Sequence, residues 1–132
     1  MAQGHIQHGY TMDYVNDSTN DIASGDVVVI GEIVGIAITD IGAGDTGAVA
    51  TEDVWEIVKA SDAITQGALV YWDDEGDPVD GVEGTGAITT TATDNMLAGI
   101  AWTNAEATDG VVHVKLNACI IVNITEATES DG

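Results

Sequence analysis

The sequence is poor in cysteine, proline and basic residues, and these shortages exclude several classes of protein. Its 132 residues include one cysteine, one proline, no phenylalanine and two basic residues, Lys59 and Lys115, against 23 acidic ones, so the formal net charge is −21 at pH 7. The single cysteine, Cys119, cannot form a disulfide within the chain, and its apolar neighbours indicate a buried side chain rather than a nucleophile. So negative a chain should repel phosphate backbones and anionic membrane surfaces. Neither nucleic acid nor a membrane is therefore expected as a partner.

Long hydrophobic runs are missing as well, although short ones are frequent. No run approaches the roughly 18 apolar residues of a membrane helix. Hydrophobic residues nevertheless make up 45% of the chain, in runs of strand length, which argues for one folded domain rather than disorder. The acidic residues fall in expected turns and at the C-terminal end, so the charge should lie on the surface. Because molar salt screens repulsion between surface carboxylates, this charge density predicts a halophilic protein.

Motifs typical of enzymes and metal sites are absent or incomplete. Residues 42–47 match the dinucleotide pattern G-x-G-x-x-G, but a β-prone run follows them instead of a helix, so we expect a turn. The acidic segment 73–77 could hold a hard cation, yet it lacks the EF-hand spacing, and a solvated turn is favoured. His5, His8 and His113 do not form a cluster typical of transition-metal sites. The sequence therefore predicts no catalytic residue, no cofactor and no metal, and the protein is not expected to be an enzyme.

A short apolar segment occurs twice. Ile33–Thr39 matches Leu97–Thr103 at a step of 64 residues (97 − 33), and both copies contain glycine, alanine and threonine at corresponding places. Upstream, Ile22–Val28 matches Ile64–Val70 at a step of only 42 residues (64 − 22). The second half thus carries 22 extra residues (64 − 42) between these segments. This pattern predicts a duplicated β-motif packed on itself.

Each copy has a glycine, Gly35 or Gly99, inside its apolar run. A glycine weakens a strand unless a bulge, a bend or a close neighbouring backbone requires it. We therefore expect both glycines to be bend points in a small, strongly curved barrel.

The spacing of apolar runs and turn residues predicts an all-β protein, a small barrel or sandwich of about ten short strands. The expected strands lie at 10–15, 27–30, 33–38, 47–50, 54–58, 68–72, 88–93, 97–103, 111–116 and 119–124. A helix over 52–60 is the alternative for the fifth of these, but its Val, Trp and Ile residues favour a strand. We expect a polar N-terminal arm at 1–9, the β-barrel domain at 10–125 and an acidic tail at 126–132.

Three tryptophans, Trp55, Trp72 and Trp102, stand out in a chain without phenylalanine. They fill the core, or one or more of them anchors an interface between subunits, where aromatic residues are enriched. The sequence leaves both interpretations open.

An ordered set of short motifs, spread over residues 5–117, carries a resemblance to a known family. The motifs are Tyr10–Asn16, Ile22–Ile30, Val34–Ala37, Gly44–Ala50, Val54–Ala60, Ile64–Asp73, Gly99–Ala101 and Val112–Asn117. Taken together they resemble the DUF2190-type capsid decoration (cement) proteins of tailed phages, which are compact β-barrels. Two stretches depart from that family: 73–85 is longer and more acidic, and 118–132 extends beyond the usual end.

The resemblance implies a structural virion protein, made in the host cytoplasm and located on the outer surface of the capsid. It implies a homotrimer that bridges neighbouring copies of the major capsid protein and stabilises their lattice. It also implies that the N-terminal arm reaches onto a neighbour, so the expected capsid contacts are His5, Ile6, His8 and Tyr10. The expected subunit interface candidates are the three tryptophans.

Two other functions are weighed against this one. An acidic DNA mimic would occupy a nucleic-acid-binding protein, but it needs carboxylates spaced along one face, whereas here they are scattered among turns. A metal-dependent hydrolase would use residues 73–77. The decoration protein is the preferred hypothesis.

Overall fold

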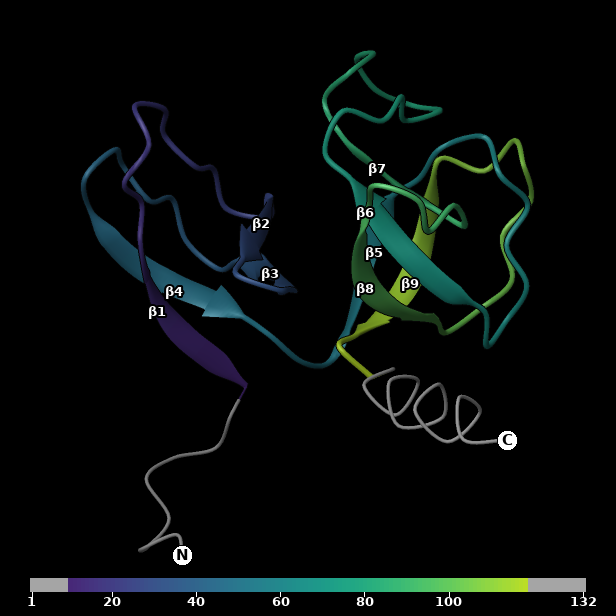
Figure 1. Ribbon diagram of the computed structural model, residues 1–132, viewed down its shortest axis with the longest axis horizontal. Coiled ribbons are helices and arrows are strands. Elements are labelled where there is room, and N and C mark those ends of the chain that lie inside the picture. Colours follow the sequence, from purple (N-terminus) through teal and green to yellow (C-terminus); the bar gives the residue numbers. More distant parts are fainter. Residues whose placement is uncertain (1–9, 119–132) are drawn as a thin grey trace, which may run out of the picture.

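The computed structural model describes residues 10–118, and these form nine strands and no helix (Figure 1). The strands are β1 (Thr11–Val15), β2 (Val27–Ile30), β3 (Ile33–Ala37), β4 (Thr46–Ala50), β5 (Val54–Val58), β6 (Leu69–Asp73), β7 (Ala87–Thr89), β8 (Met96–Ala101) and β9 (Val111–Leu116). The all-β expectation is confirmed, and the alternative of a helix over 52–60 is wrong because β5 occupies that segment. The arm at 1–9, the strand expected at 119–124 and the tail at 126–132 lie outside the described residues.

The strands form two antiparallel sheets, with the orders β1-β4-β3-β2 and β5-β9-β8-β6-β7 (Figure 1). We call β1–β4 the first unit and β5–β9 the second unit. Neither sheet is closed into a barrel. A single parallel bridge, between Lys59 and Ile88, connects the two edges of the five-stranded sheet.

The two units are copies of one four-stranded sheet, as the sequence repeat predicts. Strands β1, β4, β3 and β2 correspond in order to β5, β9, β8 and β6. The registers agree at the glycines, since Val28 pairs with Gly35 in the first unit and Val70 pairs with Gly99 in the second. Beyond this pair the second unit has an irregularity that the first lacks, and Tyr71 pairs with Leu97. Turn hydrogen bonds repeat in the same way, for example the one from Ile22 N to Ile41 O at 2.9 Å and its counterpart from Ile64 N to Ala105 O at 2.8 Å.

The extra residues of the second half lie between β6 and β8, where they form a long loop and β7. Strand β7 pairs antiparallel with the outer edge of β6, opposite Tyr71, Trp72 and Asp73. In the described part of the first unit, no strand pairs with the outer edge of β2, which corresponds to β6.

The two repeated glycines allow a neighbouring strand to approach closely. A Cβ on Gly35 would lie 2.8 Å from the carbonyl oxygen of Ala50, and one on Gly99 would overlap the carbonyl oxygen of Lys115. A bulge, a bend or a close neighbouring backbone can require a glycine within a strand, and a close neighbouring backbone is present at both positions.

The units share one hydrophobic core because β3 and β8 lie against each other. Val34, Ile36 and Ala50 of the first unit belong to the same buried cluster as Val70 and Val114 of the second. Each fully buried Val or Ile contributes about 1.5–3 kcal/mol to stability, so neither unit could expose its inner face without a large loss. A smaller cluster fills the other face of the first sheet.

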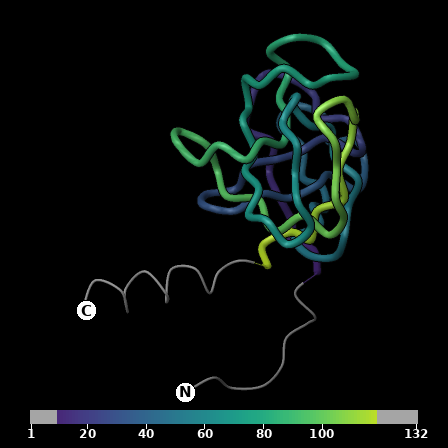
Figure 2. The backbone as a smooth tube through the Cα atoms, turned by 90° about the vertical axis from the view of Figure 1, so that its right-hand side faces the viewer, coloured from purple at the N-terminus to yellow at the C-terminus, as the bar shows by residue number. Residues whose placement is uncertain are grey.

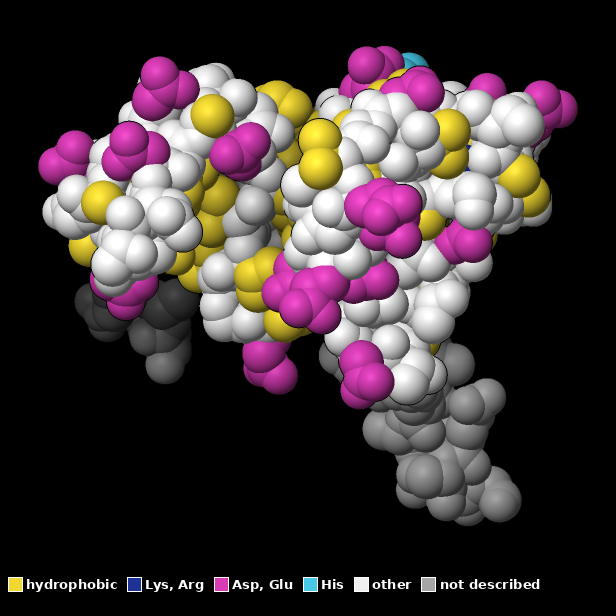
Figure 3. All heavy atoms as spheres, turned by 90° about the horizontal axis from the view of Figure 1, so that it is seen from above, with side chains coloured by type: hydrophobic (Ala, Val, Ile, Leu, Met, Phe, Trp, Pro, Cys, Tyr) yellow, Lys and Arg dark blue, Asp and Glu magenta, His cyan; other side chains and the backbone are white. Residues whose placement is uncertain are grey.

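None of the acidic side chains among residues 10–118 is buried. Figure 3 shows the Asp and Glu side chains in separate groups over both units, with apolar side chains visible in the hollow between the units. The surface location of the charge is thereby confirmed for the described residues. The same residues contain no helix long and apolar enough to cross a membrane.

Candidate interaction surfaces

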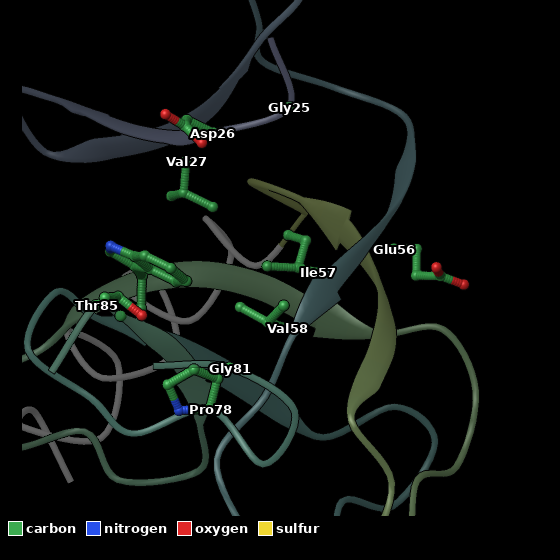
Figure 4. Close-up of a pocket in the computed structure, with 11 residues that line it drawn as sticks. Gly25, Asp26, Val27, Glu56, Ile57, Val58, Pro78, Gly81 and Thr85 are labelled. Carbon is green, nitrogen blue, oxygen red and sulfur yellow. The ribbon is translucent and has the colours of Figure 1, made fainter. Parts of the chain in front are cut away.

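A groove of about 520 Å³ lies between the two units (Figure 4). The start of β2 lines one wall, β5 lines the other, and Trp72 and the loop before β7 complete the lining. The lining residues are Gly25, Asp26, Val27, Glu56, Ile57, Val58, Trp72, Pro78, Gly81, Thr85 and Gly86. Figure 4 shows the side chain of Val27 pointing from the first unit into this space, across from Ile57 and Val58.

The groove offers apolar surface with carboxylates at its margins. Asp26 accepts a hydrogen bond from Ala23 N through Oδ2 at 2.9 Å, and Glu56 lies 3.3 Å from Nε2 of His113 on the exposed face of the second sheet. Within 10–118, no three His, Cys, Asp or Glu side chains gather in a way that could hold a metal ion. This surface can therefore supply apolar contacts from Val27, Ile57 and Val58 and polar contacts from Asp26, Glu56 and Thr85.

The tryptophans differ in their surroundings. Trp72 is 9% exposed and belongs to the core. Trp55 is half-buried, packs against the core and donates from Nε1 to Glu52 O at 2.7 Å. Trp102 is 48% exposed. The core interpretation therefore fits Trp72, and of the three tryptophans Trp102 presents the most surface for an interface.

Trp102 follows the glycine strand of the second unit and lies beside a hollow of about 280 Å³. Gln66 holds its backbone by donating from Nε2 to Trp102 O at 3.1 Å. The corresponding residue in the first unit is Ile38 (102 − 64), which is 41% exposed and is held by a bond from Ser24 Oγ to Ile38 O at 2.8 Å. Each unit thus exposes one large apolar side chain at the same place.

The expected capsid contacts are only partly described. His5, Ile6 and His8 lie outside the described residues. Tyr10 is half-exposed, and its carbonyl accepts a hydrogen bond from Thr51 N at 2.8 Å. Together with Met12, which is 37% exposed, Tyr10 forms an apolar surface where the chain enters the first sheet. This end of β1 and the last described residues lie at the same end of the molecule (Figure 2).

A comparison with known families gives a match that covers both units. The family model described as phage cement protein matches residues 6–116. This chain belongs to the phage cement proteins. The family places it in the phage capsid, with a decorating or stabilising role there. No curated protein and no solved structure matches the chain.

A buried lysine in this cement protein was not singled out from the sequence. Lys59, at the end of β5, is fully buried, and its Nζ donates to Glu106 O at 2.8 Å and to Asp109 O at 3.1 Å. The corresponding residue at the end of β1 is Asn16 (59 − 43), which is also fully buried and donates from Nδ2 to Ile41 O at 3.0 Å. In each unit, therefore, the side chain that follows the first strand holds the loop before the last strand by hydrogen bonds to its backbone. The sequence feature that could have drawn attention to Lys59 is that it is one of only two basic residues in the chain.

The motif-like segments of the cement protein are turns. Residues 42–47 lead into β4, with a hydrogen bond from Asp45 N to Gly42 O at 2.9 Å, so the turn expected there is confirmed. In the acidic segment, Gly76 N donates to Asp73 O at 3.0 Å. The acidic segment is therefore a backbone turn after β6, as expected.

Proposed function

We propose that this chain binds the outside of a tailed-phage head and stabilises the lattice of the major capsid protein. The observation that carries this proposal is the family match, which spans residues 6–116 and so includes both units and β7. The surface charge supports it, because exposed carboxylates facing outward would keep heads from associating. On the face that Figure 3 shows, the carboxylates lie in separate groups over both units, not in the row that a DNA mimic needs.

Two surfaces suit the two kinds of contact. The end of the molecule with Tyr10 and Met12 would contact the major capsid protein, together with His5, Ile6 and His8. Trp102 would contact a neighbouring subunit in a homotrimer, because exposed aromatic side chains are typical anchors of protein interfaces. The inner faces of the sheets are already used in the shared core.

Binding to heads tests the function. Heads that lack the protein are mixed with the purified chain, sedimented and imaged by electron microscopy. We expect saturable binding, density on the outer surface, and heads that withstand higher temperature before releasing DNA. Absence of binding, or density on the inner surface, would contradict the proposal. A partner captured among DNA-binding proteins instead of heads would favour the mimic.

A pair of tryptophan variants tests the trimer. Trp102→Ala should leave the unfolding free energy within about 1 kcal/mol, because the side chain is exposed, and should abolish the trimer. Trp72→Ala should lower the unfolding free energy by about 3–5 kcal/mol, because it empties part of the core. Ile38→Ala is the control for a general loss of exposed apolar surface. Light scattering after size exclusion measures the mass, and an unchanged mass for Trp102→Ala would reject this interface.

A further inference from the structure

Within the described part of the chain, the cationic side chains that reach the surface both belong to β9. The chain has two basic residues and three histidines. Lys59 is fully buried, and two of the histidines lie outside the described residues. The remaining two are His113, which is exposed, and Lys115, which is half-buried. They are two positions apart in β9 and therefore share one face of the sheet. On the described surface, positive charge is thus confined to one small region.

Trp102 lies beside these two cationic groups. Its backbone N–H donates to His113 O at 2.7 Å and continues the ladder in which Ile100 pairs with Lys115. Because side chains alternate along a strand, Ile100 and Trp102 lie on the same face as the cationic groups, and both line the same hollow. Val111, two residues before His113, is 39% exposed. The face that presents the most exposed tryptophan therefore also carries the accessible positive charge of the described residues.

Lys115 and Asp13 carry opposite charges, and neither side chain has a hydrogen-bonding or ion-pair partner among the described residues. The strands contain three carboxylates. Glu56 lies 3.3 Å from Nε2 of His113, and Asp73 accepts a hydrogen bond from a backbone N–H at 3.1 Å. The third is Asp13, which is exposed on β1. A strand positions a side chain more precisely than a loop does, so Asp13 is the carboxylate best suited to a sheet-on-sheet contact with Lys115.

The two faces occupy corresponding places in the duplicated fold. Asp13 pairs with Ala48 in the first unit. Its counterpart Glu56 (56 − 43 = 13) pairs with His113 in the second unit. On the same face as Asp13, Val15 is 56% exposed. The first face is therefore apolar and acidic, whereas the second is apolar and carries the cations, so each face is complementary to the other and not to itself.

We propose that the face of Lys115 and Trp102 on one copy packs against the face of Asp13 and Val15 on a second copy, with Lys115 paired to Asp13. A second copy fits this face because its net charge of −21 supplies carboxylates, and elsewhere two such chains would repel each other. The two faces differ, so the contact is head-to-tail, the type that closes into a ring when the rotation allows. This contact rests on the homotrimer of the proposed function and names the neighbouring surface that the Trp102 face meets.

Reversing the two charges, singly and together, tests the contact. At the lowest salt at which the unmodified chain associates, Lys115→Glu should raise the midpoint concentration of dissociation at least tenfold, because two carboxylates then face each other. Asp13→Lys should raise it at least threefold, although it lowers the net negative charge. The double variant restores the pair and the net charge of −21, and its midpoint should return to within about twofold of the unmodified chain. Analytical ultracentrifugation over a range of chain concentrations measures each midpoint.

A matched control separates the pair from the net charge. Lys115→Glu combined with Glu83→Lys also has a net charge of −21, but its new lysine lies on an exposed turn, so it should associate as weakly as Lys115→Glu alone. Lys115→Gln and Asp13→Asn, which remove the charges without reversing them, should weaken association by smaller factors. Circular dichroism of the dissociated subunits should be unchanged in every variant, which distinguishes loss of the contact from loss of the fold.

Three results would overturn this contact. They are single reversals that leave the midpoint unchanged, a double variant as weak as the single ones, and a control that recovers as fully as the double variant. Any of these in a chain that still forms trimers rejects the contact and leaves the proposed trimer standing. An unmodified chain that is monomeric at every salt concentration, and on heads, rejects the trimer and the contact together.

Discussion

Lys59 and Asn16 occupy corresponding positions in the two units and have the same role with different side chains. Both residues stand at the end of an edge strand and donate to carbonyls of the loop before the last strand of their unit. The lysine reaches two carbonyls, Glu106 O and Asp109 O. Both bonds are partly buried, so water would replace the lost donor poorly, and the lysine makes no ion pair that the structure describes.

Replacing Lys59 by methionine keeps most of the side-chain volume and removes the donor. We expect Lys59→Met to lower the unfolding free energy by about 1–3 kcal/mol, because the two loop carbonyls would lose their partner. The measurement is denaturant unfolding at fixed high salt. Lys115→Met removes the same charge from a half-buried position and should change stability by less than about 0.5 kcal/mol. Equal losses in the two variants would mean that charge, not the loop bonds, is responsible.

At the scale of elements, β7 depends on a glycine at its start. Gly86 has a φ of +111°, and a Cβ there would lie 2.8 Å from Cη2 of Trp72. Gly84, in the same loop, has a φ of +77° and open space around its Cα. The two positions therefore share backbone strain and differ in their contact with the tryptophan ring.

Alanine substitutions at these glycines should separate the two effects. Gly84→Ala should cost about 1 kcal/mol, from the strain of positive φ alone. Gly86→Ala should cost a further 1–3 kcal/mol or so, because the methyl group displaces the Trp72 ring from the core. Denaturant unfolding measures both variants, and the shift of tryptophan fluorescence should be specific to Gly86→Ala. Equal losses would show that the ring can move without cost.

The elements were largely predictable, and their arrangement was not. The steps of 64 and 42 residues predicted the duplication and the location of the insertion, because both copies keep the same turn and glycine positions. The expected strand at 88–93 is only β7, Ala87–Thr89, since Thr90 and Thr91 lie in the following turn region. The groove and the burial of Lys59 could not be predicted, because both arise from packing between segments far apart in the sequence. Trp102 and Trp72 occur in similar apolar contexts, so only the fold separates the exposed ring from the buried one.

At the scale of the whole molecule, the net charge of −21 should control stability. The carboxylates of residues 10–118 are at the surface, and the one close contact described there between a carboxylate and a basic side chain joins Glu56 to His113 at 3.3 Å. The surface charges therefore mostly repel one another, and their mutual repulsion opposes the folded state.

Stability should therefore rise with sodium chloride. The screening length falls from about 10 Å at 0.1 M to about 3 Å at 1 M salt, so the midpoint of thermal unfolding should increase over this range and the proposed trimer should form more readily. Thermal unfolding and light scattering over a salt series measure the two effects. Sucrose at matched concentrations is the control for solvent exclusion, which acts without screening. A melting temperature independent of salt would contradict the halophilic interpretation.

The shared core is also consistent with an origin of this chain by duplication of one unit. Val34 and Ala98 are corresponding residues (98 − 34 = 64), both fully buried where the units meet. An ancestor with one unit would have covered this face only by pairing with a second copy of itself. Joining the copies in one polypeptide replaces that encounter with an effective concentration in the millimolar range, so pairing no longer depends on how much protein is made. It also frees the copies to differ, and the second carries a loop and strand β7 that a symmetric dimer would have carried twice.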